Sequence, residues 1–180
     1  MTVIEHKEVG PQVRVWLGEW PQATYDCVAV QTIGFESPGI NTERSSKVAI
    51  EVLRGRAGHP SSYGLLGGEF LPGNRDQLTA EVCISRSHGA IFKPALISSP
   101  VDYAQVGLPD SYVLGVMEGL GGANQILGPG LLRFACAVHG LYGSSHVVFK
   151  WLAQMNVRLL ARPDDLLTSG ELTSIVNSPF

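Results

Sequence analysis

The loop that begins at Gly140 and ends at His146 carries the residue types closest to a reactive or ligand-binding site. Its sequence, Gly-Leu-Tyr-Gly-Ser-Ser-His, joins a predicted strand to a predicted helix, and free N–H groups at a helix N-terminus favour an anion. His139 and His146 flank Ser144, and a serine becomes a nucleophile when a base lies within hydrogen-bonding reach. One hypothesis is therefore a small-molecule enzyme or a binder of phosphate ligands that uses this loop. The alternative is a tight turn followed by a helix N-cap.

Other motifs of catalysis are missing from the sequence. No acidic residue lies near His139 or His146 in the sequence to orient it, and neither H-x-x-x-H nor H-E-x-x-H occurs. No G-x-x-x-x-G-K-[ST] loop occurs either, so we expect no bound nucleotide and no GTPase activity. Cys27, Cys83 and Cys136 are odd in number and far apart, which predicts reduced thiols, the last two as inert packing residues. We expect no metal and no cofactor, and the balance favours a protein that is not an enzyme.

Composition excludes several classes of protein. The chain has 180 residues, 44% hydrophobic and 16% charged, with a net charge of −3, which is too apolar for a disordered chain. No window of about 18 uncharged apolar residues occurs, so no membrane span is predicted. The N-terminus lacks the pattern of a secretory signal, and we therefore expect a cytoplasmic protein. Residues 47–161 hold nine Lys and Arg against seven Asp and Glu, whereas the flanks together hold four against nine. The dense basic face of a duplex-binding domain is not predicted.

Hydrophobic periodicity indicates the elements that position the loop. Alternation or a continuous apolar run predicts strands at 12–19, 27–33, 47–54, 78–85 and 131–139. A period of 3.6 residues predicts helices at 109–121 and 144–160, with Ser144 or Ser145 as the N-cap of the second. The buried stripe of that helix is expected to be Val148, Trp151, Leu152, Met155 and Leu159. This order of elements predicts an α+β fold, a two-layer sandwich with both helices on one face of the sheet.

A polar stretch at 36–41 suggests how the chain is organised. Residues 1–45 are expected to form an N-terminal strand pair or extension, in which the strands 12–19 and 27–33 are joined by a turn at Trp20 and Pro21. Residues 46–162 are expected to form the main domain, and residues 163–180 a C-terminal tail.

Four short motifs occur one after another within residues 47–161. They are Tyr63-Gly64 with Pro72 nine residues after the Tyr, Leu108-Pro109-x-x-Tyr112-x-x-x-Val116-x-x-Gly119, Gly128-Pro129 before the last strand, and Ser144-Ser145-x-x-x-Phe149-Lys150. In order and spacing, this part of the chain resembles domain IV of translation elongation factor G and of the related tetracycline ribosomal-protection proteins.

The resemblance implies a fold and a functional edge. The fold is the one named for the second domain of a small-subunit ribosomal protein, with a left-handed β-α-β crossover where general chirality rules predict a right-handed one. In elongation factor G, two loops at the far end of the domain contact RNA at the decoding region, and the corresponding loops here are 57–62 and 139–143. The residues expected to face RNA are therefore His59, Ser61, His139 and Tyr142.

Both loops depart from the pattern of the family. The first loop, which is Gly-rich in the family, reads Gly-His-Pro-Ser-Ser here, and the second is shorter, with no His after Tyr142. The sequence thus predicts a stand-alone module without GTPase activity that binds the ribosome, structured RNA or another protein chain. Two alternatives stay open: the enzyme or phosphate-ligand binder that uses Ser144 and its loop, and a structural domain that pairs with another chain through its acidic flanks or residues 12–33.

Overall fold

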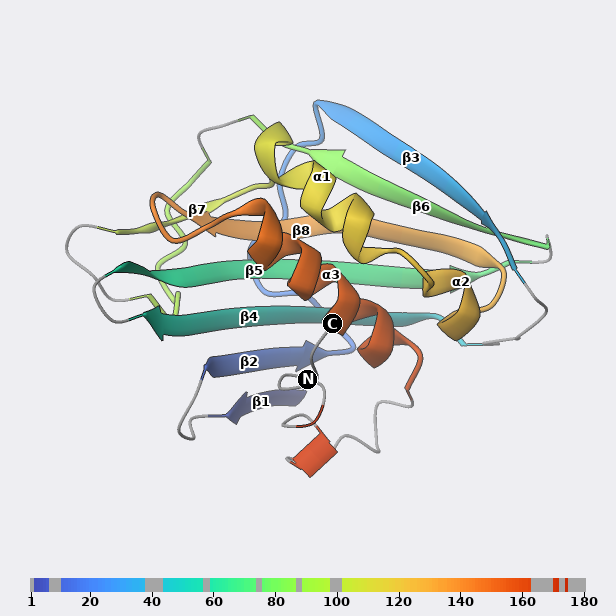
Figure 1. Cartoon of the computed structure of the whole chain (residues 1–180), viewed down its shortest axis with the longest axis horizontal. Helices are drawn as coiled ribbons and strands as arrows, with labels where there is room; N and C mark the ends of the chain where they lie inside the picture. Colours follow the sequence, from blue (N-terminus) through green and yellow to red (C-terminus); the bar gives the residue numbers. More distant parts are fainter. Residues whose placement is uncertain are drawn as a thin grey trace.

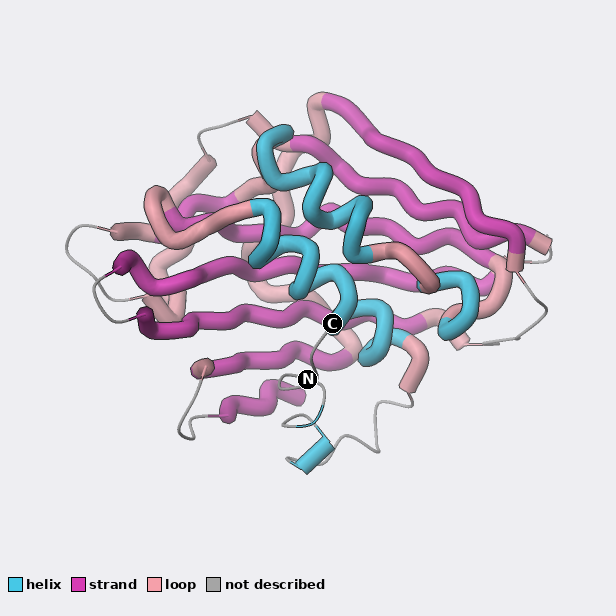
Figure 2. The backbone as a smooth tube through the Cα atoms, viewed as in Figure 1, coloured by secondary structure: helices cyan, strands magenta, loops and turns pink. Residues whose placement is uncertain are grey.

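The structure of the chain, a computed structural model, describes residues 2–6, 11–37, 44–56, 59–73, 76–86, 89–97, 102–162, 170–171 and 174. In this part of the chain, eight strands form one mixed sheet, and two longer helices lie side by side across one of its faces (Figures 1 and 2). The strands are β1 (Thr2–His6), β2 (Gln12–Leu17), β3 (Ala29–Glu36), β4 (Ser46–Arg56), β5 (His59–Pro72), β6 (Gln77–Ile84), β7 (Ala104–Val106) and β8 (Gly130–Gly140). The helices are α1 (Asp110–Gly119), α2 (Ala123–Ile126) and α3 (His146–Leu160). The predicted α+β class is confirmed.

The strands follow the order β1-β2-β4-β5-β8-β6-β3, and the short β7 pairs with the end of β8. Neighbouring strands are antiparallel except β6 and β8, which are parallel. The five strands and two helices expected from periodicity all form. Within the described residues, no helix is long and apolar enough to cross a membrane.

The predicted pairing of strands 12–19 and 27–33 is wrong. β2 pairs with β1 and β4, whereas β3 pairs with β6 at the opposite edge of the sheet. The segment between β2 and β3 is no hairpin turn, because Trp20 donates a hydrogen bond from Nε1 to the carbonyl of Val48 and Thr24 forms a β-bridge with Cys136. The chain therefore crosses one face of the sheet between its two edges.

The first predicted loop is also shorter than expected. Four of its residues, 59–62, belong to β5, where Arg56 pairs with His59 and Arg54 with Ser62. Composition favours a loop because Pro60 has no N–H group, but the pairing of β5 with β8 begins only at Leu65. Residues 59–62 therefore pair with a strand on one side only, where a proline is tolerated.

The helix-covered face holds the larger core. Alternate residues of the strands, such as Ile50 in β4 and Val82 in β6, are buried there beneath the helices. α3 begins after the N-cap Ser145, whose Oγ accepts a hydrogen bond from the backbone N of Val148 at 3.4 Å. The predicted stripe of α3 is buried at Val148, Leu152, Met155 and Leu159, and Trp151 is half-buried.

The opposite face carries a second core. Residues 18–28 and 89–97 lie over it, and its buried members are Trp16, Ala23, Ala49, Tyr63, Leu65, Phe92, Ala104, Cys136 and Val138. A bulge at Ala135, where Gly67 pairs with Cys136 and Gly68 with Phe134, shifts the alternation along β8. Phe134 therefore belongs to the helix-side core and Cys136 to the second core. The side-chain oxygen of the buried Asn156 in α3 accepts a hydrogen bond from the backbone N of Gly68 at 3.1 Å. This bond satisfies the backbone N–H of Gly68 next to the bulge.

Candidate functional site

Three segments far apart in the sequence meet at one end of the sheet. They are the β4–β5 end, the β8–α3 loop at 141–145, and the residues just before β7, which lie together at the left of Figure 1. We call this group the loop end. It contains Ser61, Tyr142 and Ser144, three of the five residues expected from the sequence to form a binding edge.

Hydrogen bonds hold the β8–α3 loop against its neighbours. The Ser144 Oγ accepts from the backbone N of Gly140 at 2.8 Å and donates to the carbonyl of Tyr63 at 2.7 Å. The backbone N of Tyr63 donates to the carbonyl of Gly143 at 2.9 Å, so the loop is tied to β5 from both directions. The buried carboxylate of Asp102 accepts from the backbone N of Tyr142 at 3.1 Å. The loop therefore has a defined backbone conformation.

Close packing at Gly143 explains why this position is a glycine. A Cβ added there would overlap the carbonyl oxygen of Ser61 and lie 3.1 Å from an Asp102 carboxylate oxygen. Gly143 thus brings the two predicted loops into contact. The approach of Ser61 to the β8–α3 loop is a tertiary contact that the sequence motif does not show.

The side chains at the tip face solvent. Tyr142 is 64% exposed, and Leu141 and Tyr103 are also exposed. Arg54 at the end of β4 and His146 at the start of α3 are exposed as well. The loop end thus presents aromatic, apolar and cationic side chains on a fixed backbone.

Two of the predicted site residues are placed differently. His139 lies in β8, in agreement with the predicted strand 131–139, but it is 5% exposed, so its ring does not face solvent at the loop end as expected for an RNA contact. Its Nδ1 donates to the carbonyl of Gly107 at 3.0 Å, and its ring packs against that of Tyr112. β8 continues through His139, where Gln105 of β7 pairs with it. His59 begins β5, and its side chain lies outside the described part of the chain.

The geometry around Ser144 bears on the catalytic hypothesis. Its hydroxyl donates to one backbone group and accepts from another, both within the protein. The proton of His139 on Nδ1 is directed at Gly107. Within the described residues, no group of three His, Cys, Asp or Glu side chains is placed to hold a metal ion. Ser144 positions the loop, and these contacts do not assign it a reaction.

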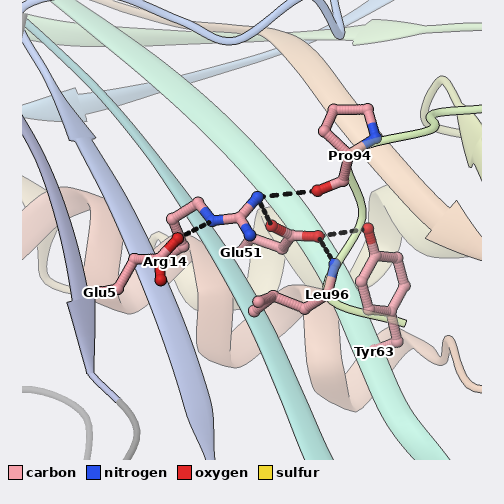
Figure 3. Close-up of polar contacts among 6 residues, drawn as sticks. All are labelled: Glu5, Arg14, Glu51, Tyr63, Pro94 and Leu96. Atoms are coloured by element: carbon pink, nitrogen blue, oxygen red, sulfur yellow. Dashed lines mark hydrogen bonds and ion pairs between the residues drawn. The ribbon is translucent and has the colours of Figure 1, made fainter. Parts of the chain in front are cut away.

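A second polar cluster lies on the face of the sheet opposite the helices (Figure 3). Glu51 of β4 is fully buried there, and its Oε1 accepts hydrogen bonds from the Tyr63 hydroxyl at 2.8 Å and the backbone N of Leu96 at 2.7 Å. Its Oε2 forms an ion pair with Arg14 at 3.2 Å, and Arg14 also donates to the carbonyl of Pro94 at 2.8 Å. Glu51 and Arg14 together fix residues 94–96 across the second core. Alternation along β4 places Glu51 opposite the helix-facing residues, but the sequence does not show what covers it.

Burial raises the pKa of Glu51 above its usual value of 4.5, despite the opposing effects of its hydrogen bonds and of Arg14. Because the pKa is higher in the folded state, the folded protein binds more protons than the unfolded chain as the pH rises above about 4.5. The wild type should therefore lose stability over this range relative to a Glu51→Gln variant, which cannot titrate at this position. Urea unfolding of both proteins between pH 4 and 8 measures the difference. A wild type that gains stability over Glu51→Gln with rising pH would contradict the prediction.

Comparison of the chain with protein-family models, with curated proteins and with solved structures gives no match. Its function is therefore inferred from the loop end and its chemistry.

Proposed function

We propose that this chain is a non-enzymatic binding module of the cytoplasm whose loop end contacts structured RNA, with the ribosome as the RNA-bearing particle. We propose further that it shares the two-layer fold of domain IV of elongation factor G, including the left-handed β-α-β crossover. The arrangement in Figure 1 supports this relationship, because β6 and the parallel β8 are neighbours and α1, which connects them, lies on the same face as α3.

The observation that carries the proposal is the exposed Tyr142 on a loop with a fixed backbone. An aromatic ring can stack on an unpaired base, and each such contact contributes about 1–3 kcal/mol. A loop whose backbone is already fixed by hydrogen bonds loses little conformational freedom on binding. The bonds at Tyr142, Gly143 and Ser144 supply that preorganisation.

Charge at the loop end fits a small RNA contact. Arg54 is exposed and pairs in register with Ser62, which places its cationic group near the tip. A module with few such cations neutralises few phosphates, so its affinity should fall with salt along a shallow slope. Shape and stacking then supply most of the recognition, as is usual for structured RNA.

Replacing Tyr142 tests the proposal. Tyr142→Ala should weaken binding to purified small ribosomal subunits about 5- to 150-fold, the range expected for one lost stacking contact, whereas Tyr142→Phe should keep the ring and most of the affinity. Co-sedimentation at low salt measures binding. Ile126→Ala is the matched control, because Ile126 is exposed on α2 at the other end of the sheet. If wild type does not bind, or if Tyr142→Ala binds as well as wild type, the proposal fails.

A further inference from the structure

Two cysteines that are 56 positions apart in the sequence are neighbours beside the edge of the sheet. Cys27 lies just before β3 and Cys83 lies in β6, the strand that pairs with β3. The backbone N of Val28 donates to the carbonyl of Ile84 at 2.9 Å, which holds the two segments together at this point. The Cys27 thiol donates to the carbonyl of Ala29 at 3.1 Å, and Cys27 lies close enough to Cys83 to help raise the pKa of the Cys83 thiol. Both thiols are reduced in the structure.

The two thiols differ in accessibility. Cys27 is exposed, whereas Cys83 is 3% exposed, and burial, with a smaller contribution from the neighbouring Cys27, raises the pKa of Cys83 to about 12. An open cleft of about 300 Å³ lies beside the pair, and its lining includes residues adjacent to both cysteines: Tyr25, Asp26, Val28, Ser85 and Arg86. A small reagent in solvent can therefore reach Cys27 before the buried Cys83.

We propose that Cys27 and Cys83 form a reversible intramolecular disulfide, with a low-molecular-weight disulfide such as glutathione disulfide as the oxidant. The Cys27 thiolate attacks one sulfur of the oxidant, its S–S bond breaks, and one glutathione leaves as a thiolate. Cys83 then loses its proton to solvent and attacks Sγ of Cys27, which releases the second glutathione thiolate. The protein dithiol is oxidised by two electrons, and glutathione disulfide is reduced to two molecules of glutathione.

The disulfide would fasten a weakly held strand. β3 ends the strand order, and six of its eight residues are exposed, so few buried contacts hold it to β6. A covalent bond beside its first residue keeps β3 on the sheet and closes a long loop of chain, which stabilises the folded state relative to the unfolded ensemble. Oxidation is therefore expected to slow hydrogen exchange along β3 more than elsewhere.

The test is treatment of the dilute protein with excess glutathione disulfide, followed by unfolding, alkylation of free thiols and mass spectrometry. Wild type should lose two of its three thiols without gaining the mass of glutathione, and a peptide pair joined through Cys27 and Cys83 should be found. The Tm should rise by about 5 °C or more and return to its starting value after reduction. This measurement on wild type needs no variant to fold.

Variants separate this reaction from others. Cys136→Ala should still form the disulfide, because Cys136 takes no part, and Cys27→Ser should leave the Cys83 thiol free for alkylation after unfolding. A glutathione adduct that persists on Cys27, or a disulfide between Cys27 residues of two chains, would overturn the proposal. So would a wild type in which Cys83 stays reduced.

Discussion

Replacing Gly115 by alanine is expected to lower the free energy of unfolding by about 3 kcal/mol. A Cβ at Gly115 would overlap the backbone carbonyl of His146, and a Cβ at Gly119, one turn further along α1, would overlap the carbonyl of Lys150. The two glycines let the backbones of α1 and α3 touch, and backbone atoms cannot rotate away as a side chain can. The helices must therefore separate to admit a methyl group.

The sign of this effect distinguishes packing from helix propensity. In an exposed helix, glycine to alanine stabilises by about 1 kcal/mol, so propensity alone predicts the opposite result. The neighbouring Leu114 is 63% exposed, and Leu114→Ala should change stability by less than about 0.5 kcal/mol. Urea unfolding of Gly115→Ala, Leu114→Ala and wild type provides the comparison. A Gly115→Ala protein as stable as wild type would show that the helices do not meet at this glycine.

Glu51→Ala is expected to lower the free energy of unfolding by about 3–5 kcal/mol. The substitution leaves the buried Tyr63 hydroxyl and the backbone N of Leu96 without their acceptor, and it removes the buried partner of Arg14. Unpaired buried donors retain their full desolvation penalty. Residues 94–96 should also become more mobile, because two of their contacts with the sheet depend on Glu51 and Arg14.

Glu51→Gln is the matched variant for this prediction. Its amide oxygen can still accept from Tyr63 and Leu96, so it should be less destabilised than Glu51→Ala at every pH. Thermal or urea unfolding at neutral pH ranks the three proteins, and hydrogen exchange at Leu96 reports the mobility of the covering segment. Equal stability of Glu51→Ala and wild type would mean that the cluster contributes nothing to the fold.

Local periodicity predicted the strands and helices that bury one face, but it missed β5, the longest strand in the described part of the chain. Residues 63–68 of β5 are buried without alternation and three of them are glycines, so no period of two emerges. Leu78, Ala80 and Val82 alternate in β6, and Leu152 and Met155 recur at helical spacing in α3. The shorter elements β1, β7 and α2 carry too few residues for a period to emerge. The hydrogen bond from Val148 to the predicted cap Ser145 shows that capping chemistry is also local.

Strand pairing and the site depend on contacts that sequence spacing does not contain. β2 and β3 follow one another in the sequence but lie toward opposite edges of the sheet, because residues 18–28 cross one of its faces. His139 was expected to face RNA because the resemblance places the second loop at 139–143, but β7 pairs with this end of β8 and the His139 ring is buried. The cluster at Glu51 forms only when a segment 45 residues further along the chain covers the strand.

The central claim is that the loop end contacts structured RNA. The most direct test is a titration of the isotopically labelled protein with an RNA stem-loop from the decoding region, followed by amide chemical shifts in NMR spectra. Shift changes confined to residues 54–63 and 140–147, and absent from the same titration of Tyr142→Ala, are the predicted result. Changes centred on the exposed side of the helices or on β3, or no changes at all at low salt, would contradict the account.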